Sequence, residues 1–168
     1  LRAGILGPVR ILVPLVVSSE QIHWVKTAIR DAQQEMQAEG LPFASGVPLG
    51  IMIEVPLAAT MVQHWTELVD FLCVGTNDLF ASAMGVGRDD PVSDIVCDPF
   101  HPGLMRIVEH VVSAGHAAGK PVTICGELAA TEQGVRLLAE MGVDALSVAV
   151  EHIERVRNLL ADWAGSGS

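Results

Sequence analysis

The segment 69–79, VDFLCVGTNDL, places an apolar run directly before a glycine and three polar residues. Strands that are covered on both faces are near-continuous apolar runs, and residues 71–74 (FLCV) fit that pattern. The polar cluster therefore falls at the carboxyl end of a predicted strand. In parallel α/β folds, this is the end at which binding and catalytic sites form.

The same alternation of apolar strand and amphipathic helix extends in both directions from this segment. Strands are predicted over 10–19, 48–56, 69–79, 120–127 and 144–150, and helices over 19–39, 57–68, 104–118, 131–142 and 152–164. Five strands that alternate with helices predict a parallel sheet with right-handed crossovers. The pattern alone leaves open whether this sheet is open or part of a barrel.

Composition limits the classes of protein to consider. The 168 residues are 50% hydrophobic, enough for one sizeable core. A net charge of -10 with only 10 Lys and Arg argues against nucleic acid or an anionic membrane as partner. The three cysteines contain no CxxC pair, so we expect a reducing, cytoplasmic setting, and no apolar stretch is long enough to predict a membrane span.

Three of the predicted strands end in chemically capable side chains. Glu54 ends the second strand, the cluster Thr76–Asp78 ends the third, and Cys125 ends the fourth. Because the carboxyl ends of parallel strands share one edge, we expect these groups to converge there. Glu54 and Asp78 could supply two carboxylates to Mg²⁺, and a thiol at the same edge could donate a proton.

Each candidate also has a structural interpretation. Glu54 precedes Val55 and Pro56, an arrangement typical of a helix cap. Arg88, in a glycine-rich loop, could clamp a phosphate or carboxylate, although a lone loop arginine is usually solvated. Cys73, in mid-strand, and Cys97 are interpreted as structural residues, and His101 as a turn or cap residue.

At these residues the sequence resembles a known family. The stretches GIMIEVPLAA (50–59), VDFLCVGTNDL (69–79) and HPGLMRIVEHVVSAGHAAGKPVTICGELAA (101–130) resemble the C-terminal phosphoenolpyruvate-binding domain of phosphoenolpyruvate-protein phosphotransferases, enzyme I of the sugar phosphotransferase system. The resemblance covers nearly the whole chain. FHPGLMR (100–106) is closer to the nitrogen-related branch.

The resemblance implies a fold and a role for each candidate. The fold would be α/β, a partial (β/α)8 TIM barrel of about five C-terminal strand-helix units. Glu54 and Asp78 would hold Mg²⁺, and Cys125 would protonate the enolate as phosphate leaves for a protein histidine. The predicted substrate-binding residues are Gly75, Thr76, Asn77 and Arg88, with phosphoenolpyruvate and pyruvate as ligands.

Departures from the family pattern shape the remaining expectations. The chain has five predicted strands instead of eight, and it lacks the family's earlier phosphate-binding arginines. It also lacks the family's phosphohistidine domain, which would pass the phosphoryl group to a phosphocarrier protein. We therefore interpret residues 1–164 as the C-terminal part of the barrel domain and 165–168 as a disordered tail. We expect the isolated chain to be inactive and to form a homodimer that covers its open sheet edges.

Two other classes of function are compatible with the sequence. One is a metal-dependent aldolase or lyase acting on pyruvate or oxaloacetate, which would not need the thiol of Cys125. The other is a non-catalytic module that senses phosphoenolpyruvate or serves in dimerisation.

Overall fold

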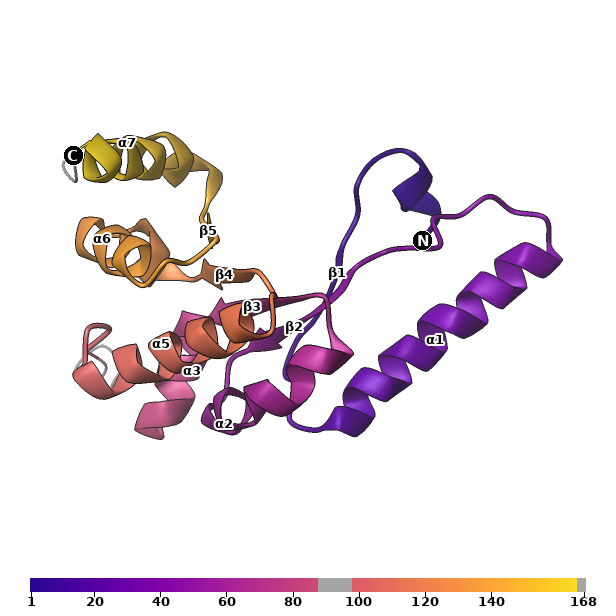
Figure 1. The fold of residues 1–168 in the computed structure, drawn as a ribbon, viewed down its shortest axis with the longest axis horizontal. Coiled ribbons are helices and arrows are strands. Elements are labelled where there is room, and N and C mark those ends of the chain that lie inside the picture. The colour runs from indigo at the N-terminus through magenta and orange to yellow at the C-terminus, as the bar shows by residue number, and fades with distance from the viewer. Residues whose placement is uncertain (88–97, 166–168) are drawn as a thin grey trace.

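The chain folds around one parallel five-stranded sheet. The computed structural model describes residues 1–87 and 98–165. The strands are β1 (Ile11–Val13), β2 (Leu49–Ile53), β3 (Phe71–Gly75), β4 (Val122–Cys125) and β5 (Ala145–Ser147), and their order in the sheet is their order in the chain (Figure 1). Every neighbouring pair is parallel. The predicted α/β class is confirmed, and this sequential order is that of successive units of a (β/α)8 barrel.

Helices follow the strands as predicted. The helices of the described residues are α1 (Ser19–Ala38), α2 (Pro56–Trp65), α3 (Thr76–Met84), α5 (Pro102–Ala117), α6 (Glu132–Glu140) and α7 (Ile153–Gly165), with 3₁₀ turns η1 (Arg2–Ile5), η2 (Thr66–Leu68), η3 (Glu127–Ala130) and η4 (Val150–His152). Among the described helices, none combines the length and apolarity that a membrane crossing requires.

The core lies between the sheet and the helices. Side chains at alternate strand positions, such as Ile51, Leu72 and Ile124, are fully buried because α2 packs on β2, and α5 on β3 and β4. The alternate residues point to the other face of the sheet, where Met52 and Thr123 are only partly buried. One face of the sheet is therefore the core face, and the other is less completely covered, although Phe71 and Cys73 of β3 are buried there as well.

All five strands are shorter than the sequence predicted, and two of them differ for a clear physical reason. The predicted strand 10–19 is a strand only over Ile11–Val13, since Pro14 cannot donate to a ladder and Leu15 has a positive φ of 49°. The predicted strand 69–79 ends at Gly75, and Thr76 begins α3, a helix that the sequence analysis did not predict. The polar cluster is thus the first turn of a helix.

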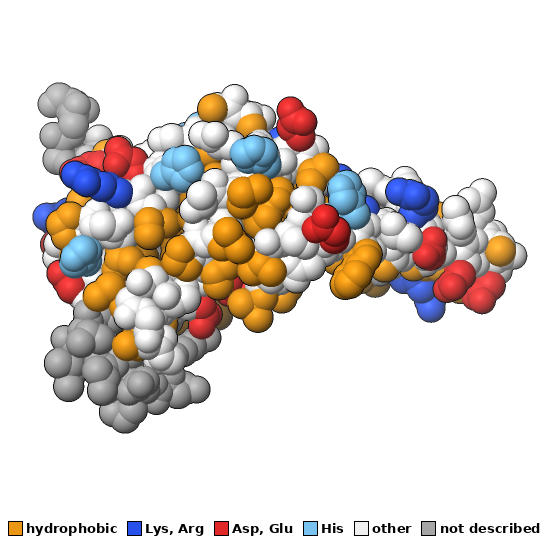
Figure 2. All heavy atoms as spheres, turned by 90° about the horizontal axis from the view of Figure 1, so that it is seen from below, with side chains coloured by type: hydrophobic (Ala, Val, Ile, Leu, Met, Phe, Trp, Pro, Cys, Tyr) orange, Lys and Arg blue, Asp and Glu red, His pale blue; other side chains and the backbone are white. Residues whose placement is uncertain are grey.

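The outer surface leaves several large hydrophobic side chains exposed. Figure 2 shows hydrophobic side chains gathered over the middle of the face seen from below, whereas the part at the right, where α1 extends in Figure 1, is mostly polar and charged. The exposed large hydrophobic residues are Ile5, Leu6, Leu12, Leu15, Val17, Trp24, Leu57, Met84, Val150, Ile153 and Trp163. In α1 only Ile22 is buried, so this helix contributes little to the core.

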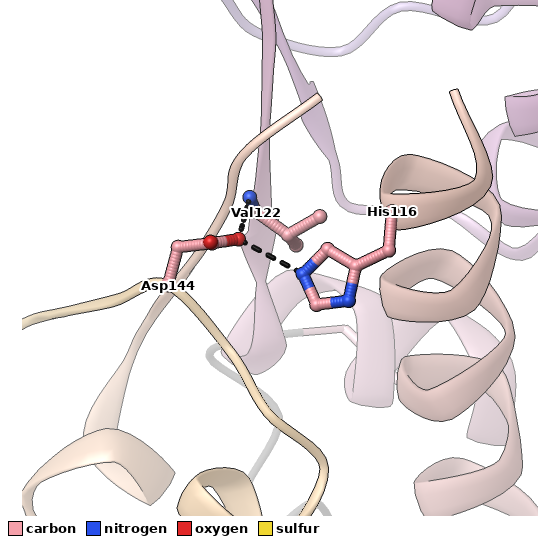
Figure 3. Close-up of polar contacts among 3 residues, drawn as sticks. All are labelled: His116, Val122 and Asp144. Carbon is pink, nitrogen blue, oxygen red and sulfur yellow. Dashed lines mark hydrogen bonds and ion pairs between the residues drawn. The ribbon is translucent and has the colours of Figure 1, made fainter. Parts of the chain in front are cut away.

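At the amino end of the sheet, an aspartate just before one strand is hydrogen-bonded to the first residue of the neighbouring strand that comes earlier in the chain. Asp70 accepts a hydrogen bond from Leu49 N at 2.8 Å and returns one from its own N to Leu49 O. Asp144 repeats the arrangement with Val122 at 2.7 Å, and His116 Nε2 lies 3.0 Å from the same Asp144 oxygen (Figure 3). These paired contacts fix the register at the end opposite the predicted site.

We predict that Asp144→Asn makes stability less sensitive to acid. The hydrogen bond from Val122 N, helped by His116, lowers the pKa of Asp144, although partial burial opposes this. The ionised Asp144 carboxylate therefore stabilises the folded state fully above the ordinary aspartate pKa of about 3.9. This stabilisation is lost as the pH falls through the lowered folded-state pKa. The variant should unfold more easily by about 0.5 kcal/mol at pH 7, because water screens the exposed Asp144 side chain, with the gap closing below about pH 4. Urea unfolding at several pH values measures this.

The exposed carboxylate Asp31 on α1 offers a control. Asp31→Asn should leave both the stability at pH 7 and its acid dependence close to those of the parent chain. A constant gap between Asp144→Asn and the parent chain down to pH 3 would contradict the prediction, because it would show that ionisation of Asp144 does not matter.

Candidate active site

The predicted site residues that the structure describes lie at one edge of the sheet. Glu54 directly follows β2, the cluster Thr76–Asp78 directly follows β3, and Cys125 is the last residue of β4. All three strands are parallel and paired, so these positions share the carboxyl edge. The structure therefore brings together the two carboxylates and the thiol that the sequence placed on separate strands.

Glu54 is held by backbone contacts and is not a helix cap. Its side chain is buried, and Oε1 accepts a hydrogen bond of 2.7 Å from Leu15 N in the turn after β1. Val55 is the N-cap residue of α2 and has no side-chain capping bond. Gly75 lies close to the second oxygen, because a Cβ at Gly75 would lie 3.3 Å from Glu54 Oε2. The cap interpretation of Glu54 is wrong, and the carboxylate is oriented toward the end of β3.

The first turn of α3 is tied to the end of β4. Thr76 is 1% exposed and donates a hydrogen bond of 2.9 Å from Oγ1 to Cys125 O. Asn77 Oδ1 accepts a bond of 3.1 Å from Glu127 N, which leaves the N–H donors of its amide for another partner. Gly126 passes so close to this turn that a Cβ there would collide with Thr76 Oγ1. Thr76 and Gly126 thus fix where Asn77 and Asp78 begin the helix.

Cys125 lies among sulfur atoms and carboxylates. Its Sγ lies 3.7 Å from Cys73 Sγ, 3.7 Å from Met52 Sδ and 3.3 Å from Val74 O. The thiol contact with Cys73 lowers the pKa of Cys125, while burial and the negative charges of Glu54 and Asp78 oppose that shift. The same contact, together with burial, raises the pKa of Cys73. Of the two, Cys125 is therefore the thiol suited to exchanging a proton.

A cleft adjoins this edge at the carboxyl ends of β4 and β5. It has a volume of about 580 Å³ and is lined by Asn77, Gly126, Glu127, Ala130, Thr131, Ser147, Val148, Ala149, His152 and Arg155. Arg155 was not predicted as a site residue, and it brings a positive charge to the cleft from α7. Asn77 belongs to both the cleft and the turn beside Cys125, so the cleft continues into the candidate site.

The oxygen donors at this edge fit a hard divalent cation. Mg²⁺ in proteins is bound by one or two carboxylates and completes its shell with water and substrate oxygens. Glu54 and Asp78 are two such carboxylates on neighbouring strand-helix units, and both act electrostatically on Cys125. Within residues 1–87 and 98–165, no group of three or more His, Cys, Asp or Glu is placed to hold a metal. Glu54 and Asp78 could therefore hold a cation only together with water or ligand oxygens.

Other predicted residues and two missed ones complete the description. Arg88 and Cys97 lie outside the described residues. His101 caps α5 by accepting a bond from Gly103 N, as predicted.

Met52 and Cys73 were not predicted as neighbours of Cys125. The alternation of side chains along a strand could have revealed them. Met52 lies two residues before Glu54 and Cys73 two residues before Gly75, so each points to the same face of the sheet as the residue that follows it by two.

Fold and site together define an α/β domain of barrel type with carboxylates and a thiol at the carboxyl edge of its strands. The chain belongs to the family of PEP-utilising enzymes, PEP-binding domain, whose sequence pattern it matches over residues 1–164. It is 35% identical over 160 residues to the phosphoenolpyruvate-protein phosphotransferase of Streptococcus equinus, covering 95% of this chain and 28% of that protein. The multiphosphoryl transfer protein 1 of Escherichia coli K12 is 36% identical, with 95% of this chain and 19% of that protein covered. The chain thus spans less than a third of the length of these relatives.

Solved structures support the fold. A citrate lyase from Burkholderia xenovorans has a TM-score of 0.67 at 20% identity, covering 94% of this chain and 50% of that one. A pyruvate kinase from Cryptosporidium parvum has a TM-score of 0.60 at 15% identity, with 83% of this chain and 27% of that one covered. At this level of identity the likeness concerns the fold alone. It agrees with the sequential strand order of a barrel domain.

Proposed function

We propose that this chain is the part of a phosphoenolpyruvate-protein phosphotransferase that binds phosphoenolpyruvate and protonates the product. The reaction would transfer the phosphoryl group to a protein histidine and release pyruvate. The observation that carries the proposal is the convergence of Glu54, Asp78 and Cys125 at one sheet edge, where both carboxylates influence the thiol. Membership of the PEP-binding family supports the choice of ligand.

Each residue of the site has a distinct part in this proposal. Glu54 and Asp78 would hold Mg²⁺, which would draw charge from the phosphoryl and enolate oxygens. Asn77 would donate its amide hydrogens to the phosphate, because its oxygen is already used by Glu127 N. Gly75 and Thr76 would line the ligand, and Arg88 would pair with its oxygens. The basic side chain of Arg155 makes the adjoining cleft suitable for an anion.

The thiol of Cys125 would complete the reaction. When the phosphoryl group leaves, the remaining enolate carries an electron pair that reaches its methylene carbon. Transfer of the Cys125 proton to that carbon forms the methyl group of pyruvate and leaves a thiolate, which regains a proton from solvent. The contact with Cys73 lowers the pKa of Cys125, which makes it easier for this thiol to give up its proton.

The proposed function also implies two protein partners, a phosphocarrier protein and a second copy of the chain. A phosphocarrier protein would receive phosphate through a histidine-bearing domain, and the chain would pair with a second copy in a cytoplasmic homodimer. The unpaired outer edges of β1 and β5 in the described sheet support self-association, because unpaired strands tend to be covered. The exposed hydrophobic side chains support it as well.

We expect phosphoenolpyruvate to bind in a manner that depends on Mg²⁺ and on both carboxylates. Calorimetric titration of the chain should show binding heat with Mg²⁺ present and about tenfold weaker binding when it is omitted. Glu54→Gln and Asp78→Asn should each reproduce the weak binding even with Mg²⁺, because each removes one charged ligand.

Glu67→Gln provides the matched control. Glu67 is an exposed carboxylate in η2, before β3 and therefore at the other end of the sheet, so the variant should bind like the parent chain. Equal affinity with and without Mg²⁺ would refute the metal part of the proposal. Absence of heat in both conditions would favour a purely structural module.

A further inference from the structure

We propose that Met52, Cys73 and Cys125 form a binding site for one soft monovalent cation, Cu(I) or Ag(I). The three side chains come from the adjacent strands β2, β3 and β4 and meet on the face of the sheet opposite the core helices, where Met52 and Cys125 are partly buried and Cys73 is buried. Cys125 Sγ lies 3.7 Å from both Cys73 Sγ and Met52 Sδ. The inference concerns sulfur donors and is separate from the oxygen donors assigned above to Mg²⁺.

The spacing of the sulfur atoms suits a shared metal ion. A metal–sulfur bond of about 2.3 Å in tetrahedral or trigonal geometry places sulfur ligands roughly 3.7–4.0 Å apart. The observed separations of 3.7 Å fall within that range. Met52 is the register partner of Cys73, so these two side chains lie directly opposite each other and point the same way. Little rearrangement would be needed to bring all three sulfurs onto one ion.

The strand register favours a bridging ion over a disulfide. Cys73 pairs with Thr123, and Cys125 pairs with Gly75, so the two cysteines are displaced by two residues along neighbouring strands. With strands about 4.8 Å apart and a rise of about 3.3 Å per residue, the Cα atoms are about 8 Å apart. Disulfides usually span Cα separations of about 4.4–6.8 Å. Direct oxidation would therefore require backbone movement, which a metal bridge would not.

The donor set determines which cations can bind. Thiolate and thioether sulfurs select soft ions such as Cu(I), whereas Mg²⁺ requires oxygen. Binding would replace the two thiol hydrogens, so one cation enters and two protons leave to solvent. The nearby negative charges of Glu54 and Asp78 would attract the incoming cation, while they oppose loss of the Cys125 proton in its absence. A consequence for catalysis rests on the proposed function: a bound cation would replace the Cys125 proton that the reaction needs, and so it would stop pyruvate formation.

Competition with a coloured Cu(I) chelator, such as bicinchoninate, tests the site in the purified chain without any substrate. One Cu(I) per chain should be withdrawn from the chelator, with two protons released and no displacement by excess Mg²⁺. Cys73→Ser and Cys125→Ser should weaken binding more than the roughly 10- to 100-fold typical of losing an outer-shell partner. Met52→Leu should weaken it about tenfold, since the neutral thioether is the weakest of the three donors.

Two matched controls change the same residue types elsewhere. Met84→Leu alters an exposed methionine of α3, and Cys97→Ser removes the remaining thiol of the sequence, so both should bind Cu(I) like the parent chain. Unchanged binding in Cys73→Ser or Met52→Leu would overturn the proposal. If a variant fails to fold, the methyl resonance of Met52 in the parent chain decides the matter, because it must shift when Ag(I) is added. Because no substrate is present, this result is independent of phosphoenolpyruvate binding.

Discussion

Cys125→Ala should slow the exchange of pyruvate methyl protons with deuterated water by roughly 10²- to 10⁴-fold, the range for losing a general acid-base group. The exchange runs the proposed protonation in reverse, because the thiolate removes a proton from the methyl carbon and then returns a deuteron. It requires pyruvate, Mg²⁺ and this chain but no phosphate acceptor, so it tests the proton transfer even though the isolated chain is expected to be inactive in phosphoryl transfer. Proton NMR of the methyl signal over time measures it.

The control variants separate the proton-transfer role from general damage. Cys97→Ala should exchange like the parent chain if the effect is specific to Cys125. Cys73→Ala should have an intermediate effect, because it removes the contact that lowers the pKa of Cys125. Phosphoenolpyruvate affinity should survive in Cys125→Ala, since the thiol serves the proton transfer and not the binding.

The same experiment distinguishes the alternative functions. A metal-dependent aldolase or lyase that enolises pyruvate by another base would exchange the methyl protons at an unchanged rate in Cys125→Ala. A sensing module would bind phosphoenolpyruvate but show no exchange in the parent chain. Either result would remove the thiol from the chemistry and so contradict the proposed function.

The order of strands and helices could be predicted from the sequence because that order depends on local patterns. Apolar runs such as 71–74 and helical spacing after residue 19 are visible without knowledge of the fold, and the structure confirms five parallel strands. Convergence of Glu54, Asp78 and Cys125 at one edge followed from the parallel arrangement alone. Those parts of the site were therefore predictable before any coordinates.

The parts that could not be predicted depend on tertiary contacts. The polar residues 76–78 lie in the first turn of a helix, which is tied by a bond from Thr76 to Cys125 O, a partner 49 residues away. Glu54 is positioned by Leu15 N, 39 residues away, and a local cap pattern gave no hint of that contact. The Cys73–Cys125 contact likewise depends on the register between β3 and β4, which no short motif specifies.

We predict that Gly126→Ala destabilises the chain by about 3 kcal/mol and weakens phosphoenolpyruvate binding. Gly126 has φ of +111° and ψ of 175°, a backbone region that is essentially restricted to glycine. A Cβ would also collide with Thr76 Oγ1 and lie 2.7 Å from Asn77 Oδ1. The loop after β4 would have to move away from α3, which would break the bond from Glu127 N to Asn77. Urea unfolding and calorimetric titration measure the two effects.

Gly119→Ala separates backbone strain from the collision. Gly119 also has a positive φ, +67°, but a Cβ there would meet nothing within 4 Å, so we expect a loss of about 1 kcal/mol with unchanged ligand affinity. If both variants lose the same stability and bind equally well, the first turn of α3 does not depend on the close approach of Gly126. The larger loss in Gly126→Ala, combined with weaker binding, would mean that the β4–α3 junction both stabilises the fold and positions Asn77 for the ligand.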